Sequence, residues 1–136
     1  MLIQETLPFV SSATLKTRSP EECKGSANIS QSIDTYGMGT VFFYLLTLQR
    51  TYSFNANLPG PPEEYPDWYR EHIIKGDQPK LPDAVELHKN PAIIAIKKAM
   101  RAAMTNDPRN RISASSTADF LERELSQYRN ISIQQR

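Results

Sequence analysis

The hydrophobic and polar positions follow a helical period over most of the chain after residue 19. The strongest pattern covers 30–49, where apolar side chains occupy every face of the expected helix. A helix that is apolar all round is typical of a core element enclosed by its neighbours. Ser30 or Ser32 is suited to cap its N-terminus. Since Gly37 and Gly39 each cost about 1 kcal/mol in a helix relative to alanine, they suggest a closely approaching neighbour.

Shorter helical patterns surround this central segment. In Ser19–Cys23, "SPEEC", a proline at the first helical position and two carboxylates predict one helical turn. Longer helices are expected at about 62–75, with Gly76 as the stop, from Asn90 and Pro91 to the segment "NDP", and after Ser113. The 62–75 helix is expected to bury the face formed by Trp68, Tyr69, His72 and Ile73. The apolar face of the next helix is expected to be Ile93, Ile96, Met100 and Met104 or Ala103, and that of the last helix Ala114, Ala118, Leu121 and Leu125. The pattern predicts a mainly α protein, a helical bundle around a buried central helix, with 1–18 extended or loop and 129–136 a frayed tail.

Length and charge limit the classes of function. The 136 residues suit one domain, and 16 Lys+Arg against 15 Asp+Glu leave a net charge of +1. This balance provides no electrostatic basis for binding nucleic acid or an anionic membrane. The central apolar run is shorter than the about 20 residues needed to cross a bilayer. With no visible signal peptide, the single cysteine, Cys23, favours a reducing, cytoplasmic compartment.

Three short motifs occur in a characteristic order. They are "RSPEE" at Arg18–Glu22, "IDTYGMG" at Ile33–Gly39 and "NDPRNRISA" at Asn106–Ala114. Together with "IIKGDQPKLP" between the last two, they resemble the C-terminal half of the eukaryotic protein kinase domain. The first resembles the family's A-P-E motif, with Ser19 in place of the alanine before Pro20 and Glu21. The second resembles D-x-W-x-x-G, supplied here by Asp34, Tyr36 and Gly39, and the third resembles D-P-x-x-R, supplied here by Asp107, Pro108 and Arg111.

The resemblance runs from about Ala13 to Leu125 and implies a domain organisation. Residues 1–22 are expected to be a partial activation segment, and 23–128 the remainder of the helical lobe. Glu21 and Arg111, which are 90 positions apart, are expected to form the family's buried ion pair, to which the guanidinium fork is well suited. Asp34 is expected to accept hydrogen bonds from the backbone of a catalytic loop, or to serve as an ordinary first-turn acid.

The resemblance also bears on the type of kinase. Thr14 stands five residues before Ser19, where Ser/Thr kinases carry a threonine in the substrate-facing loop, so the Ser/Thr type is favoured over the Tyr type. Thr17 stands where an aromatic residue is usual in Ser/Thr kinases. An ordinary loop role for Thr14 remains the alternative.

The parts of a kinase that carry out the chemistry are missing from this sequence. It has no G-x-G-x-x-G loop, no nucleotide-binding lysine of the V-A-I-K type, no HRD and no DFG. By family order these motifs precede residue 1. We therefore expect no catalytic, cofactor-binding or metal-binding residue here, although ATP and Mg²⁺ belong to the complete family domain. His72 and His88 have no partner at metal-ligand spacing.

Two interpretations follow. The chain is a catalytically inactive fragment of a protein kinase, or a free-standing helical module that binds protein through Trp68 and Tyr69 of the 62–75 helix. Packing of these two aromatics on the core is preferred over a docking role. In both cases, we expect apolar surface of the central helix to face water and to promote self-association or binding of a chaperone, a substrate or the missing kinase half.

Overall fold

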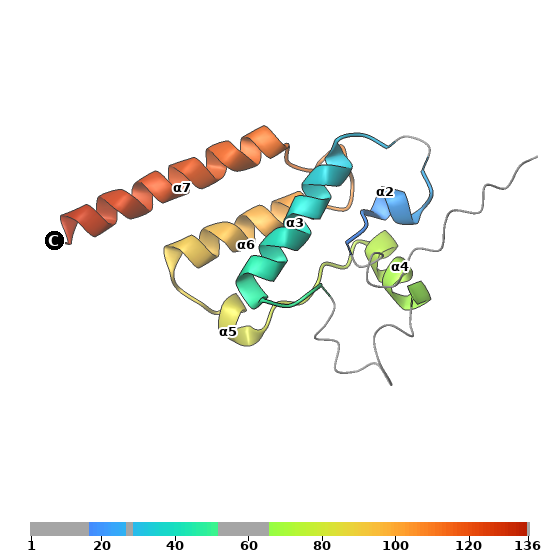
Figure 1. Ribbon diagram of the computed structural model, residues 1–136, viewed down its shortest axis with the longest axis horizontal. Helices are drawn as coiled ribbons and strands as arrows, with labels where there is room; N and C mark the ends of the chain where they lie inside the picture. The colour runs from blue at the N-terminus through green and yellow to red at the C-terminus, as the bar shows by residue number, and fades with distance from the viewer. Residues whose placement is uncertain (1–16, 27–28, 52–65, 136) are drawn as a thin grey trace, which may run out of the picture.

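The computed structural model describes residues 17–26, 29–51 and 66–135. Its helices are α2 (Pro20–Cys23), α3 (Ser32–Thr47), α4 (Pro66–Lys75), α5 (Asp83–Glu86), α6 (Pro91–Ala103) and α7 (Ala114–Gln134) (Figure 1). The described part of the chain contains no β-strand. The prediction of a mainly α protein is therefore confirmed.

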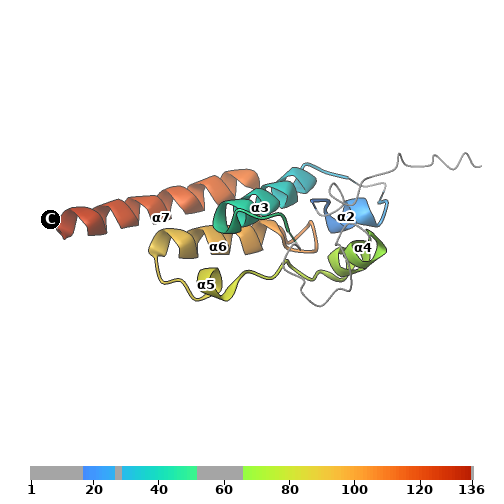
Figure 2. The ribbon, with the colours of Figure 1, turned by 60° about the horizontal axis from the view of Figure 1, so that its bottom comes forward.

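The helices form two groups. In the larger group α3 crosses α6, and α7 runs beside α6 and extends past its end (Figures 1 and 2). In the smaller group α2 packs against α4 near the N-terminal end of α3. The short helix α5 lies at the far end of α3, where the chain turns into α6 (Figure 2).

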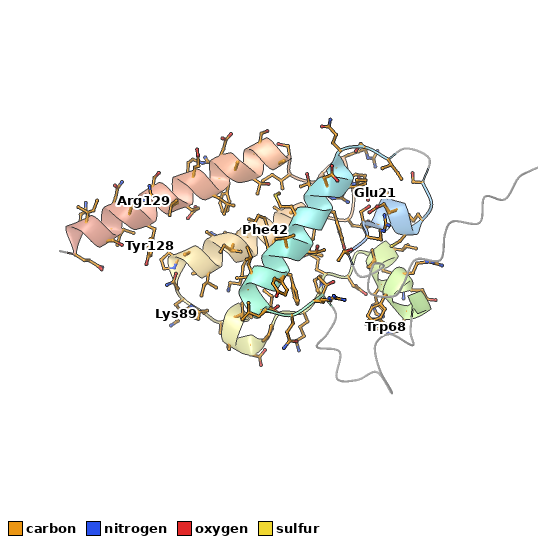
Figure 3. The ribbon with its side chains drawn as sticks, viewed as in Figure 1. Glu21, Phe42, Trp68, Lys89, Tyr128 and Arg129 are labelled. Carbon is orange, nitrogen blue, oxygen red and sulfur yellow. The ribbon has the colours of Figure 1, made fainter. Side chains whose placement is uncertain are left out.

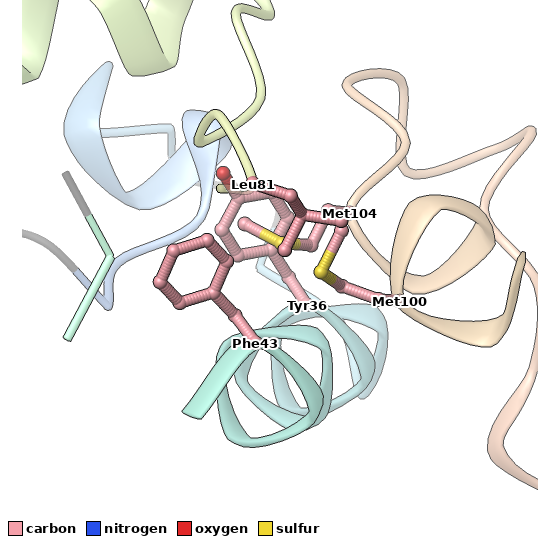
Figure 4. Close-up of a cluster of buried hydrophobic side chains, with 5 residues drawn as sticks. All are labelled: Tyr36, Phe43, Leu81, Met100 and Met104. Carbon is pink, nitrogen blue, oxygen red and sulfur yellow. The ribbon is translucent and has the colours of Figure 1, made fainter. Parts of the chain in front are cut away.

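The main core forms where α3 meets α6. Tyr36 and Phe43 project from α3 toward Met100 and Met104 of α6, and Leu81 closes the cluster from the segment after α4 (Figure 4). All five side chains are buried. Fully burying a residue of this kind stabilises the fold by roughly 1.5–3 kcal/mol, so this cluster is the principal hydrophobic contribution to the α3–α6 contact.

A second cluster joins α4 to α2. Tyr69 and Ile73 are fully buried there, with Cys23 and Trp68 packed against them. Trp68 and Tyr69 meet edge to face, with ring centroids 5.2 Å apart. The preferred interpretation, that these aromatics pack on the core, holds for Tyr69, which has no exposed ring surface to offer a partner.

The central helix α3 is covered on one side only. Its buried residues face α6, whereas Val41, Tyr44, Leu45 and Leu48 are 55%, 51%, 59% and 77% exposed. The prediction that this helix is enclosed on all sides is therefore wrong, because no described element covers the side opposite α6. The expectation that its apolar surface faces water is confirmed for these four side chains.

The ends of α4, α6 and α7 that were predicted from sequence follow local signals, whereas the predicted start of α3 is an exception. Asn90 caps α6 by accepting a hydrogen bond from Ala92 N, Ser113 caps α7 by accepting one from Ser116 N, and Gly76 ends α4 with φ +88°. The exception is α3, whose N-cap is Gln31 without a side-chain cap. There the Ser30 hydroxyl accepts a hydrogen bond from Ser32 N at 3.2 Å.

Helix α7 differs from its prediction in face and in length. Ala114, Ala118 and Leu125 are exposed, while Thr117 is buried. Thr117 fits the buried face because its hydroxyl donates to Ser113 O within the same helix, at 2.8 Å. The expected frayed tail is also wrong, because α7 continues as a regular helix to Gln134.

Candidate functional site

Arg111 lies in the turn between α6 and α7 and points into the junction of the two helical groups. Its side chain has no exposed surface, and that of Glu21, on α2, is 8% exposed. Arg111 Nη1 donates to Glu21 Oε1 at 2.7 Å, and Nη2 donates to Oε2 at 3.0 Å. Two parallel bonds of this kind fix the orientation of both groups as well as their separation. The ion pair that the resemblance implies is present.

The remaining hydrogen bonds of Arg111 go to three backbone carbonyls and to the Ser32 hydroxyl. Nε donates to Thr105 O at 2.9 Å, and Nη2 donates to Asn106 O at 3.1 Å, just beyond the end of α6. A cation is favourable there because the end of a helix carries carbonyl groups and a partial negative charge. Nη1 also donates to Ser32 O, in the first turn of α3, at 2.8 Å. One side chain therefore joins α2, α3 and the end of α6.

Helix α2 is built so that Glu21 can reach this junction. Ser19 N donates to Glu22 Oε2 at 2.8 Å, and Glu22 N donates to Ser19 Oγ at 3.3 Å, forming a capping box. Arg18 Nη1 donates to the other oxygen of Glu22 at 2.8 Å. Because Glu22 is engaged at the start of its own helix, Glu21 is the carboxylate that α2 directs toward Arg111. Glu21 lies on α2 near the N-terminal end of α3 (Figure 3).

Burial and pairing act on Glu21 in opposite directions. Burial alone raises the pKa of the Glu21 carboxyl. The hydrogen bonds and the positive charge of Arg111 lower this pKa by a larger amount, so the net pKa lies below its usual value of 4.5. A carboxyl with a lowered pKa stabilises the fold above its unfolded-state pKa. That contribution is lost as the pH falls through the lowered, folded-state value.

Acid should therefore destabilise the wild-type chain more steeply than the Glu21→Gln variant. We expect the free energy of unfolding of the wild type to fall as the pH drops below about 4.5, with a shallower fall for Glu21→Gln, whose side chain cannot titrate. Urea denaturation followed by circular dichroism at a series of pH values measures both slopes. Glu71→Gln, at an exposed position on α4, is the control and should retain the wild-type slope. Equal slopes for Glu21→Gln and the wild type would contradict the role of this pair.

Asp34 occupies a different environment. It is exposed in the first turn of α3, at an open hollow of about 560 Å³ that Ser32, Arg111, Ser113 and Ala114 also line. No described residue donates a hydrogen bond to its carboxylate. Within the described ranges Asp34 is thus a first-turn acid, favourably placed at the positive end of the helix dipole.

The other motif residues have structural positions. Asp107 Oδ2 accepts a hydrogen bond from Arg109 Nη2 at 2.9 Å, and Asp107 Oδ1 accepts one from Arg109 N at 2.9 Å, which closes the turn before α7. Gly39 lies against α6: a Cβ there would overlap Met104 Cγ and lie 3.2 Å from Ala103 Cβ. A Cβ at Gly37 would meet nothing within 4 Å, so the close approach predicted for both glycines occurs only at Gly39. Thr14 lies outside the described residues.

One polar cluster was not predicted. Lys97 is buried on α6, and its Nζ donates to Glu86 O at the end of α5, at 2.5 Å. Arg101 Nη2 donates to the Glu86 carboxylate at 2.6 Å. The sequence held a signal for this cluster, since Lys97 falls within the apolar stripe between Ile93 and Met100, where a charge needs a buried partner.

The two histidines and the cysteine have local contacts or a buried environment. His72 Nδ1 lies 2.7 Å from Asp77 Oδ2, and His88 Nδ1 accepts a hydrogen bond from Asn90 N at 3.1 Å. Burial raises the pKa of the Cys23 thiol to about 11, which keeps it protonated and unreactive. Within 17–26, 29–51 and 66–135, no group of three His, Cys, Asp or Glu residues is arranged to hold a metal ion. No helix in these ranges combines the length and the hydropathy that a membrane crossing requires.

Comparison of the chain with protein-family models, with curated proteins and with solved structures finds no match. The site is therefore defined by its own geometry. It is a buried Glu21–Arg111 junction that holds a short capped helix, the start of α3 and the end of α6 together.

Proposed function

We propose that the chain is the helical-lobe part of a protein kinase domain, favouring the Ser/Thr type, and that it does not transfer phosphate by itself. The observation that carries this proposal is the Glu21–Arg111 ion pair. Its two residues come from the segments that resemble A-P-E and D-P-x-x-R, and they meet across 90 positions of sequence. The pairing is the one that the resemblance implies.

Two further features support the proposal. Gly39, the glycine of the D-x-W-x-x-G-like motif, lies so close to α6 that a Cβ there would overlap the Met104 side chain, which gives that glycine a packing role. Asp34 stands at the head of the same helix with its carboxylate toward an open hollow. In the family that the chain resembles, the matching carboxylate holds a catalytic loop. We propose that Asp34 binds a segment supplied by another protein chain.

The part of the proposal that concerns phosphate transfer is tested by titrating the purified chain with ATP and Mg²⁺ in a calorimeter. We expect no binding heat, because the sequence has no glycine-rich loop, no nucleotide lysine and no DFG aspartate to hold the phosphates or the metal. Saturable binding of ATP, or transfer of labelled phosphate to a generic Ser/Thr substrate, would overturn it. A Ser/Thr kinase domain of known activity provides the positive control.

The second candidate function is a free-standing module that binds protein. The exposed apolar side of α3 favours it, since contiguous apolar surface is a common feature of interaction sites. Sequencing the transcript upstream of the codon for Met1 separates the two. An open frame that encodes HRD and DFG supports the kinase fragment, whereas a frame without them supports the module.

A further inference from the structure

The start of α3 faces the turn between α6 and α7 across the hollow of about 560 Å³ described above. On the α3 side this hollow is lined by Asp34, Thr35 and Met38. Asp34 and Thr35 precede Met38 by four and three residues, so the three side chains share one side of the helix. Pro108 and Ile112 line the opposite side. A space of this size lies in the range of pockets that bind ligands.

The hydroxyl of Thr35 is available to a ligand in this hollow. Thr35 is 5% exposed, and no described residue makes a hydrogen bond to its hydroxyl. The hydroxyls of Thr40, Thr47 and Thr117, by contrast, each donate to a carbonyl of their own helix. A buried polar group without a partner costs stability. A polar group that enters the hollow and reaches Thr35 would remove that cost.

The charge that the hollow offers is negative. Only two of the described residues that line it are charged, Asp34 and Arg111. Arg111 is paired with Glu21, and its other donors are taken by Ser32 and by the carbonyls just beyond the end of α6. Asp34 is exposed, and no described residue donates a hydrogen bond to its carboxylate. A ligand therefore meets one carboxylate and no available cation among the described lining residues.

The amide groups at the start of α3 do not favour an anion. Ser32 N donates to Ser30 Oγ at 3.2 Å, and Ile33 N donates to Ser30 O at 3.1 Å. Asp34 N donates to Gln31 O at 3.1 Å. The start of a helix binds an anion through free N–H groups, and these three groups are engaged. The charged ligand that the hollow favours is thus a cation.

From these observations we infer that the hollow binds a cationic side chain, lysine or arginine, of a segment from another protein chain. The cationic group donates hydrogen bonds to the Asp34 carboxylate and the Thr35 hydroxyl. Its aliphatic stem packs against Met38 and Ile112, as the stems of long charged side chains commonly do on apolar surface. The inference rests on the proposed function, in which Asp34 binds a segment of another chain, and adds the chemistry of that segment.

The first test is a titration of the full 136-residue chain at low ionic strength, followed by NMR at the Thr35 amide and the Met38 methyl group. The probe is a five-residue blocked peptide with lysine at its centre and alanine elsewhere. Matched peptides carry arginine, glutamate or norleucine at the centre, and norleucine keeps an aliphatic stem without the charge. We expect saturable shifts with lysine and arginine, and an affinity about three- to fivefold lower with norleucine. Equal affinities for lysine and norleucine, or tighter binding of glutamate, would overturn the inference.

The second test removes the charge of Asp34. We expect Asp34→Asn to abolish the difference in affinity between the lysine and norleucine peptides, because the amide keeps the shape of the side chain without its charge. Asp119→Asn, the same substitution at an exposed position on α7, is the control and should retain the difference. A thermal melt of each variant verifies that it is folded. A difference that persists in Asp34→Asn would assign the selectivity to another site and overturn the inference.

The third test removes the hydroxyl of Thr35. We expect Thr35→Val to weaken binding of the lysine peptide by about twofold or more and to leave the melting temperature unchanged or higher, because the hydroxyl has no partner among the described residues. Thr117→Val is the control, since the Thr117 hydroxyl donates to Ser113 O at 2.8 Å and its loss should lower the melting temperature. Equal losses of melting temperature in the two variants would show a structural role for Thr35 and overturn its assignment to the ligand.

These results can be separated from those that bear on the proposed function. Binding of ATP by the chain would contradict the proposed function and would not change the order of the peptide affinities. Equal binding of all four peptides at Thr35 and Met38 would leave a protein segment as the ligand of the hollow and would overturn its basic character alone.

Discussion

Arg111→Ala is expected to lower the free energy of unfolding by about 3–5 kcal/mol, the cost of removing one partner from a buried ion pair. The substitution leaves the Glu21 carboxylate buried without its cation, and it removes the donors to Thr105 O, Asn106 O and Ser32 O. For a small domain this is a large fraction of the total stability. We therefore expect the variant to be partly or wholly unfolded at room temperature.

Arg109→Ala provides a matched control in the same turn. Its side chain is 87% exposed, and its pairing with Asp107 is open to solvent, so we expect little change in stability. Urea denaturation followed by circular dichroism measures both variants against the wild type. If Arg111→Ala and Arg109→Ala unfold at the same urea concentration, the junction does not hold the fold together in the way described above.

The second prediction concerns the two glycines of α3. Gly39→Ala is expected to lower the free energy of unfolding by about 1–2 kcal/mol, because the added methyl group overlaps the Met104 side chain and crowds Met100 O on α6. Gly37→Ala adds the same methyl group where nothing lies within 4 Å, and should raise stability by up to about 1 kcal/mol through helix propensity. The two substituted positions are only two residues apart, but the substitutions should change the free energy of unfolding in opposite directions.

Chemical denaturation of both variants at one protein concentration checks this prediction. A gain in stability for Gly39→Ala would show that α6 can move away from α3 at little cost. That result would contradict the close approach described at this position.

The features that could be predicted from sequence are those with local or motif-based signals. Asn90, Ser113 and Gly76 mark helix ends because capping depends on one side chain or one backbone angle. The Glu21–Arg111 pair was predictable because its two motifs occur in a recognisable order. The central helix was predictable because of its long apolar run.

The features that escaped prediction depend on tertiary packing. Thr117 was not among the residues expected on the inward face of α7, but a threonine whose hydroxyl bonds within its own helix can be buried. Which side of α3 remains uncovered cannot be read from a helix that is apolar all round, since every direction is equivalent in the pattern. Lys97 indicates by its place in an apolar stripe that it has a buried partner, but the sequence does not indicate that α5 provides this partner.

The position of the Glu21–Arg111 pair also has a consequence for the order of folding. Its two residues are far apart in sequence, and they come within reach of each other only after α3 has docked on α6. We therefore expect the ion pair to form late in folding and to stabilise a core that is already assembled. Removing it should mainly accelerate unfolding and have little effect on the folding rate. For the same reason we expect α2, which the Glu21–Arg111 ion pair holds in place, to detach first during local fluctuations of the native state.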